Sequence, residues 1–240
     1  ILSATSIGLA AAMVWLHRQE LVGSLIGALR WEMVVLTWLV LLGVTTLHEF
    51  AHGLTCKHYG GEVREVGFLM LLLMPCFYCN VSDAWMFRDK SKRLRVTFAG
   101  AYFELFVWSL GVFAWRLAQP GTVPHDLAFA LLSASGLATL FNFNPLIKLD
   151  GYYLLSDALE VPNLHGRALE YTQGQLRRLL WGAPRPAGEP RGRLLLGFGL
   201  ISWLYSAAFV ALMLWALIGL WGHDWGWLGA IGTALLGYLV

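Results

Sequence analysis

Long apolar runs separated by shorter polar segments dominate the sequence. Each run carries few or no charged residues, and about 20 apolar residues in a helix are enough to cross the hydrocarbon core of a bilayer. The pattern predicts an all-α polytopic membrane protein with about six transmembrane helices, over residues 1–16, 33–56, 96–115, 127–147, 194–220 and 225–240. We expect one transmembrane domain over residues 1–240, with two C-terminal spans within residues 194–240.

One stretch between the second and third predicted spans breaks this pattern. Residues 66–74 are apolar, but Pro75 interrupts the run before it is long enough to cross a bilayer. The Val, Phe, Tyr and Cys content of residues 62–87 favours a β-hairpin. Non-helical backbone is tolerated at membrane depth only where protein or a water-filled cavity covers it. We therefore predict a re-entrant or interfacial β-like element beside a cavity.

Composition and charge support a membrane protein and indicate its orientation. The chain is 58% hydrophobic and 13% charged, with 12 Trp, unlike a soluble domain. The net charge of +2 gives no support for a nucleic-acid partner. Of 17 Lys and Arg, seven lie within residues 57–95 and seven within the loop 148–193. The positive-inside rule places both segments, and both ends of a six-span chain, in the cytosol.

The chain begins and ends inside apolar runs, at Ile1 and Val240. We therefore expect it to be a piece of a longer protein in which soluble domains can flank the membrane part. Its three cysteines all fall on the predicted cytosolic side, where thiols stay reduced, so no disulfide framework is expected.

A metal-binding pattern lies late in the second span, in the sequence His48-Glu49-Phe50-Ala51-His52. On a helix, His48 and His52 lie on one face, about one turn apart. Two imidazoles so placed can bind one Zn²⁺, and Glu49 then lies beside the metal as a general base. A buried Glu without a partner is costly, which argues against a purely structural role. The pattern predicts a catalytic zinc site.

A catalytic zinc usually has a third protein ligand and one open position. The pattern favours Asp150, because Pro145 and Gly151 allow the helix end to break and the carboxylate to turn inward. The predicted topology also runs the second and fourth spans in the same direction, so residues near 150 can reach the two histidines. Other candidates for the third ligand are Glu104, His58, Cys56 and the pair Cys76 and Cys79.

The histidine motif, followed by Asn142-x-x-Pro145-x-x-x-Leu149-Asp150-Gly151, resembles the site-2 protease family of intramembrane zinc metalloproteases. The resemblance covers a catalytic core of about residues 33–155. The stretch 74–85 is similar to the bacterial branch often named putative peptide zinc metalloproteases, which tends to accompany peptide modification and export systems.

The resemblance implies zinc held by His48, His52 and Asp150, with Glu49 as base. It also implies that Asn142 positions the substrate or the oxyanion. One position departs from the family: Glu104 stands where an amide is expected, so we expect it to handle substrate differently. Desolvation favours an uncharged Glu104 that hydrogen-bonds within the cavity.

These observations predict an intramembrane zinc endopeptidase that cleaves a membrane-embedded or membrane-associated peptide. The resemblance places it in a bacterial inner membrane, with the active site near the cytosolic leaflet and export-system proteins as possible partners. The alternative is a non-hydrolytic homologue that acts in a peptide maturation or export complex. A diiron membrane oxygenase needs more clustered histidines than the seven in this chain.

Overall fold

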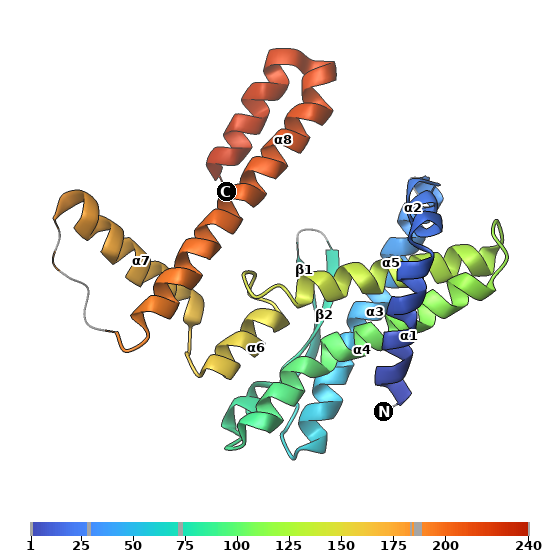
Figure 1. Cartoon of the computed structure of the whole chain (residues 1–240), viewed down its shortest axis with the longest axis horizontal. Coiled ribbons are helices and arrows are strands. Elements are labelled where there is room, and N and C mark those ends of the chain that lie inside the picture. The colour runs from blue at the N-terminus through green and yellow to red at the C-terminus, as the bar shows by residue number, and fades with distance from the viewer. Residues whose placement is uncertain (1, 28–29, 72–73, 183, 185–188, 240) are drawn as a thin grey trace. The chain divides into compact units, whose positions relative to one another are not determined.

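The computed structural model describes residues 2–27, 30–71, 74–182, 184 and 189–239, with backbone alone at 26–27, 71, 74–75 and 216–239 (Figure 1). The elements along the chain are α1 (Leu2–Leu16), α2 (Arg18–Gly27), α3 (Trp31–His58), β1 (Val66–Leu71), β2 (Met74–Cys79), the 3-10 helix η1 (Ser82–Met86), α4 (Lys90–Leu117), α5 (Val123–Asn142), α6 (Asp150–Leu159), α7 (Leu164–Trp181) and α8 (Gly192–Leu239). They form two compact units, Ile1–Glu160 and Val161–Val240. The single-domain organisation stays a prediction.

Within the described residues, four helices are long and apolar enough to cross a membrane. They are α3, α4, α5 and residues 192–215 of α8. The all-α class is correct apart from the small sheet, but six spans are not confirmed. The first predicted span is α1, whose 15 residues extend about 22 Å, short of the roughly 30 Å of hydrocarbon. The sixth, over residues 225–240, lies outside the described side chains.

The fourth predicted span is shifted along the chain. We expected a helix over residues 127–147, whereas α5 begins at Val123 and ends at Asn142. Pro124 suits the first turn of a helix, where its missing N–H costs no hydrogen bond. Pro145 cannot continue a helix, and the backbone N–H of Asn144 turns back to the carbonyl of Phe141. The early end of α5 frees the segment that carries Asp150.

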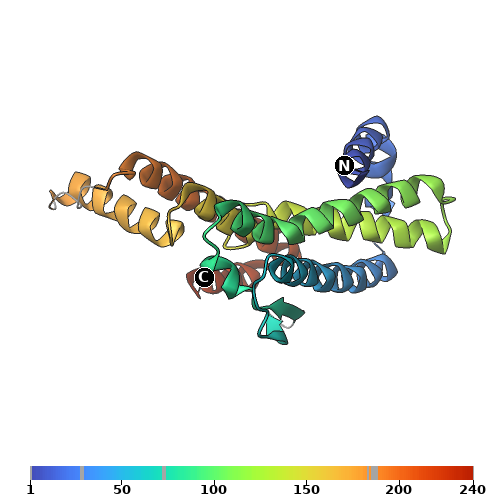
Figure 2. The same cartoon turned by 90° about the horizontal axis from the view of Figure 1, so that it is seen from below.

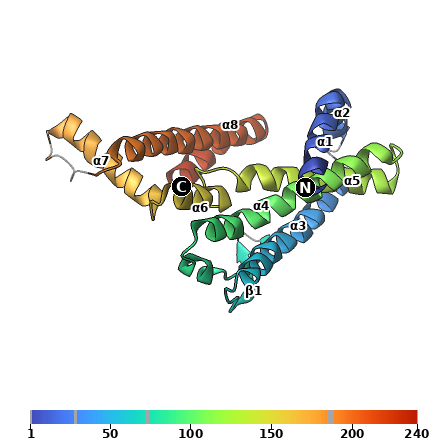
Figure 3. The same cartoon turned by 60° about the horizontal axis from the view of Figure 1, so that its bottom comes forward.

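The first unit is a helical bundle with its core where α1, α3, α4 and α5 meet. Figure 3 shows α4 and α5 running side by side with α3 next to them. Small residues allow the close approach, since a Cβ on Gly111 would lie 2.8 Å from the backbone nitrogen of Leu132. At one end of the bundle, Arg30 before α3 pairs with Asp126 of α5 at 3.6 Å. The N-terminal ends of α3 and α5 therefore lie together, as the predicted topology requires.

The β-like element is a two-stranded antiparallel hairpin of β1 and β2, as expected from its composition. Its register pairs Val66 with Cys79 and Phe68 with Phe77. Strand β2 packs against α3. Figure 2 shows the hairpin beside the C-terminal half of that helix. The hairpin therefore lies next to the predicted metal site.

The segment 148–193, which we predicted as a cytosolic loop, contains two helices. Both α6 and α7 have apolar residues on one face and polar residues on the other. In the second unit, α7 packs against α8, where a Cβ on Gly199 would lie 2.7 Å from the carbonyl oxygen of Ala168. The amphipathic period explains why a segment rich in polar residues is nevertheless helical.

Candidate metal centre

Helix α3 places the two histidines of the motif on one buried face. His48 is 5% exposed and His52 is 6% exposed. Their rings lie edge to face with centroids 4.7 Å apart, and their Nε2 atoms are 3.0 Å apart. The spacing of four residues thus produces the pair of convergent imidazoles that the sequence predicts.

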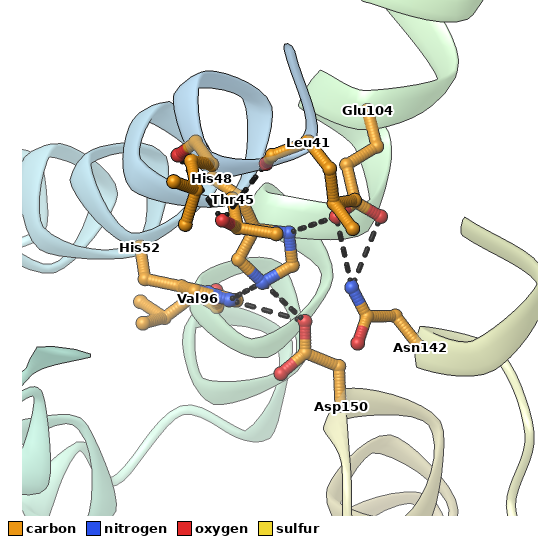
Figure 4. Close-up of polar contacts among 9 residues, drawn as sticks. Leu41, Thr45, His48, His52, Val96, Glu104, Asn142 and Asp150 are labelled. Carbon is orange, nitrogen blue, oxygen red and sulfur yellow. Dashed lines mark hydrogen bonds and ion pairs between the residues drawn. The ribbon is translucent and has the colours of Figure 1, made fainter. Parts of the chain in front are cut away.

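Asp150 reaches this pair because the chain turns sharply after α5. The turn brings the start of α6 against the end of α5, so that a Cβ on Gly151 would lie 2.6 Å from the carbonyl of Phe143. Glycine is therefore required there. The Oδ2 atom of Asp150 lies 3.0 Å from Nε2 of His48 and 3.1 Å from Nε2 of His52, as Figure 4 shows.

These three side chains can hold a zinc ion. Tetrahedral zinc with bonds of about 2.0–2.2 Å separates neighbouring ligand atoms by about 3.3–3.6 Å, close to the three distances here. Among the described residues, His48, His52 and Asp150 form the cluster whose ligand atoms converge. The alternative third ligands do not join it: Glu104, His58, Cys56, Cys76 and Cys79.

Each histidine is oriented through its other ring nitrogen. Nδ1 of His52 lies 2.7 Å from the carbonyl oxygen of Val96, and Nδ1 of His48 lies 2.9 Å from Oε1 of Glu104. The Val96 carbonyl favours the His52 tautomer with hydrogen on Nδ1, which leaves Nε2 free to bind a metal. Both Nε2 atoms lie about 3 Å from Asp150, so each histidine presents its Nε2 atom to the third candidate ligand.

Glu104 and Asn142 also lie at the site. Glu104 is completely buried in α4. The Asn142 amide nitrogen, at the end of α5, donates to both carboxylate oxygens of Glu104 at 2.9 and 3.1 Å. The structure thus brings Glu104 and Asn142 to the same site as His48, His52 and Asp150. The predicted substrate-positioning roles of Glu104 and Asn142 stay predictions.

Glu49 lies on the same helix as the histidines and is half-buried. Its Oε2 atom accepts a hydrogen bond of 3.1 Å from the backbone N–H of Cys79 in β2. Burial raises the pKa of the Cys79 thiol, and the nearby Glu49 adds to this effect. The hairpin thus contacts Glu49 through the backbone of Cys79.

The electrostatics favour an ionised third ligand. Burial alone would raise the pKa of Asp150, but before a metal binds, hydrogen bonds from Nε2 of His48 and His52 and the charge of these histidines lower it to about 2. The carboxylate is therefore charged at neutral pH, as metal binding requires.

Gly100 was not singled out as a site residue from the sequence, although it lies four residues before Glu104. A Cβ there would lie 2.4 Å from Nε2 of His52 and 2.5 Å from Nε2 of His48. We expect Gly100→Ala to displace the imidazoles and weaken zinc binding by at least about tenfold, as metal-site perturbations do. Zinc titration against a chelator measures the effect.

The matched control is Gly43→Ala, at a helical glycine of α3 whose added Cβ would meet no atom within 4 Å. It should leave zinc affinity unchanged. Equal zinc affinity of Gly100→Ala and the native protein would contradict this geometry.

Comparisons with known proteins agree with a metallopeptidase. No protein-family model and no solved structure matches the chain. The chain is 26% identical over 129 residues to the "Putative peptide zinc metalloprotease protein YydH" of Bacillus subtilis (strain 168). The similarity covers 52% of this chain and 48% of that protein, so the chain spans about half the length of the curated relative it matches.

Proposed function

We propose that the protein is an intramembrane zinc endopeptidase of the site-2 protease type. The observation that carries the proposal is the convergence of His48, His52 and Asp150 within about 3 Å, with Glu49 on the same helix. The substrate would be a membrane-embedded or membrane-associated peptide, since the site lies between helices long enough to cross a bilayer. The similarity to a protein named as a peptide zinc metalloprotease supports the same activity.

The residues of the site divide the chemistry among them. His48, His52 and Asp150 would hold the zinc ion, which would supply Lewis acidity toward the attacking water and the scissile carbonyl. Glu49 accepts a proton from water through Oε1, because Oε2 is occupied by the Cys79 N–H. The water oxygen bonds to the carbonyl carbon, and Glu49 passes the proton to the amine nitrogen as the C–N bond breaks.

The hairpin offers an edge for an extended substrate next to Glu49. The N–H of Asn80 donates to the carbonyl of Glu65, which makes this pair a hydrogen-bonded one. Hydrogen-bonded and non-hydrogen-bonded pairs alternate in an antiparallel ladder. The backbone groups of Phe77 and Cys79 therefore point away from β1, and the Cys79 N–H bonds Glu49 instead. The outer edge of β2 thus leads to the catalytic base.

A substrate helix must unwind before its backbone can be cleaved, and pairing with the outer edge of β2 would hold it extended. We expect Phe77→Pro to remove an outward N–H without breaking a hairpin hydrogen bond, and to slow cleavage or shift its position. The matched control is Phe68→Pro, which removes the outward N–H of the paired residue on β1. Unchanged cleavage rate and position in Phe77→Pro would refute pairing at this edge.

The proposed location is a bacterial inner membrane, with the site near the cytosolic leaflet, both chain ends cytosolic, and export-system proteins as partners.

Activity itself is tested by incubating the purified protein in lipid nanodiscs with a library of membrane-derived peptides and identifying fragments by mass spectrometry. Cleavage that is lost with a chelator and restored by zinc supports the proposal. The absence of zinc-dependent fragments across the library would overturn it.

A further inference from the structure

Glu104 links elements that are far apart in the sequence. It lies in the middle of α4 with 0% exposure, yet its carboxylate contacts His48 of α3 at 2.9 Å and Asn142 of α5 at 2.9 and 3.1 Å (Figure 4). A fully buried carboxylate is expensive unless its oxygens are satisfied. These contacts satisfy both oxygens and join three helices at the metal centre.

The contacts of Glu104 come from both neighbouring helices. The Asn142 amide nitrogen can only donate, and it reaches both carboxylate oxygens. On the other side, Nδ1 of His48 lies 2.9 Å from Oε1. Glu104 therefore lies between a candidate metal ligand and the end of α5.

Asn142 connects this carboxylate to the third ligand. Its side-chain amide is bonded to Glu104, and its backbone carbonyl oxygen would lie 2.8 Å from a Cβ on Gly151, the residue after Asp150. The start of α6 therefore packs against the backbone of Asn142, so Glu104 and Asp150 lie on either side of the same residue.

We propose that Glu104 and Asn142 form a positioning pair for the metal centre, in which Glu104 holds Nε2 of His48 toward the ion and the Asn142 side chain holds Glu104. This inference rests on the proposed zinc site and deepens it. It assigns Asn142 a role in metal binding through Glu104, in place of a direct contact with substrate.

The zinc dissociation constant, measured by chelator competition on the full chain, tests the pair. Loss of the outer partner of a metal-bound histidine typically weakens metal binding 10–100-fold, and we expect this for Glu104→Gln, which keeps the shape of the side chain. Glu104→Asp should restore part of the affinity. The visible spectrum of the Co²⁺-substituted protein should change in Glu104→Gln, because the orientation of His48 alters the ligand field.

A double-mutant cycle separates a coupled pair from two independent residues. If Glu104 and Asn142 act together, the Glu104→Gln/Asn142→Ala variant binds zinc about as weakly as the worse single variant. Ser109→Ala is the matched control, because Ser109 is a fully buried polar residue on the same helix that bonds Phe106 and Ser6 instead. It should leave the zinc affinity and the Co²⁺ spectrum unchanged.

The outcomes separate this inference from the proposed function. Native-like zinc affinity and Co²⁺ spectrum in Glu104→Gln, with tight binding in the native protein, would overturn the positioning role and leave the zinc site standing. Asn142→Ala with normal zinc affinity but slow cleavage would favour a direct substrate role for Asn142 and overturn the pair. A native protein that binds no zinc would remove both proposals together.

Discussion

Replacement of Glu49 by Gln is expected to lower the rate of peptide cleavage by about 10²–10⁴-fold, the usual contribution of a general base. The amide cannot accept a proton from water, although it has nearly the same size and can still accept the hydrogen bond from the Cys79 N–H. Because Glu49 does not belong to the ligand cluster, zinc binding should stay close to native. Mass-spectrometric detection of fragments at several time points measures the rate.

The Glu49→Gln variant also separates the peptidase from a non-hydrolytic export component. Loss of cleavage with peptide binding retained supports the peptidase. Unchanged peptide maturation by this variant in cells would contradict catalysis by Glu49 and favour the export component. Glu62→Gln is the matched control, since Glu62 lies in an exposed loop and pairs with Arg64 at 3.7 Å.

Replacement of Asp150 by Ala is expected to weaken zinc binding by about 10²–10³-fold. Zinc sites contribute about 10–16 kcal/mol from four ligands, so one ligand contributes about 2.5–4 kcal/mol. The loss also leaves His48 and His52 without the carboxylate that lies 3.0 and 3.1 Å from them. Metal analysis after removal of free zinc, together with chelator competition, measures the change.

Asp157→Ala is the matched control for Asp150→Ala. Asp157 lies on the same helix and is partly buried, and burial raises the pKa of its carboxyl group. It is not a member of the metal cluster, so its removal should leave zinc binding intact. Equal zinc binding by Asp150→Ala and the native protein would show that Asp150 is not the third ligand, and Glu104 would be the next candidate.

The ligand set could be predicted because each part of it has a local or topological signature. The spacing of His48 and His52 determines their common face on any helix. Asp150 needed long-range information, which came from the direction of the second and fourth spans and from the helix break at Pro145. The structure places Asp150 within about 3 Å of both histidines, as these two arguments predict; its role as a zinc ligand stays a prediction.

The surroundings of the ligands were harder to predict for physical reasons. The carbonyl of Val96 and the N–H of Cys79 orient His52 and Glu49, but backbone groups carry no sequence signature. Gly100 matches the glycine that opens the family's third-span pattern, but its role could not be assigned because it depends on a close contact with another helix. Glu104 was recognised as unusual, but its bonds to His48 and Asn142 required the three-helix packing.

Some helices were missed or given wrong bounds where the polarity of a segment and the periodicity of its apolar residues disagree. The polar composition of residues 148–193 concealed the amphipathic period of α6 and α7. In α5, hydrophobicity continues past Asn142 to residue 147, although the turn before Pro145 ends the helix earlier. Hydrophobic length alone therefore overestimated the fourth span.

The central claim is that His48, His52 and Asp150 hold one zinc ion, and zinc K-edge X-ray absorption of the protein loaded with one equivalent tests it most directly. The predicted result is a shell of nitrogen and oxygen atoms at about 2.0–2.2 Å, with the multiple-scattering features of two imidazoles. A sulfur shell at about 2.3 Å would place zinc on the cysteines instead and contradict the site. Failure to retain zinc would contradict it as well.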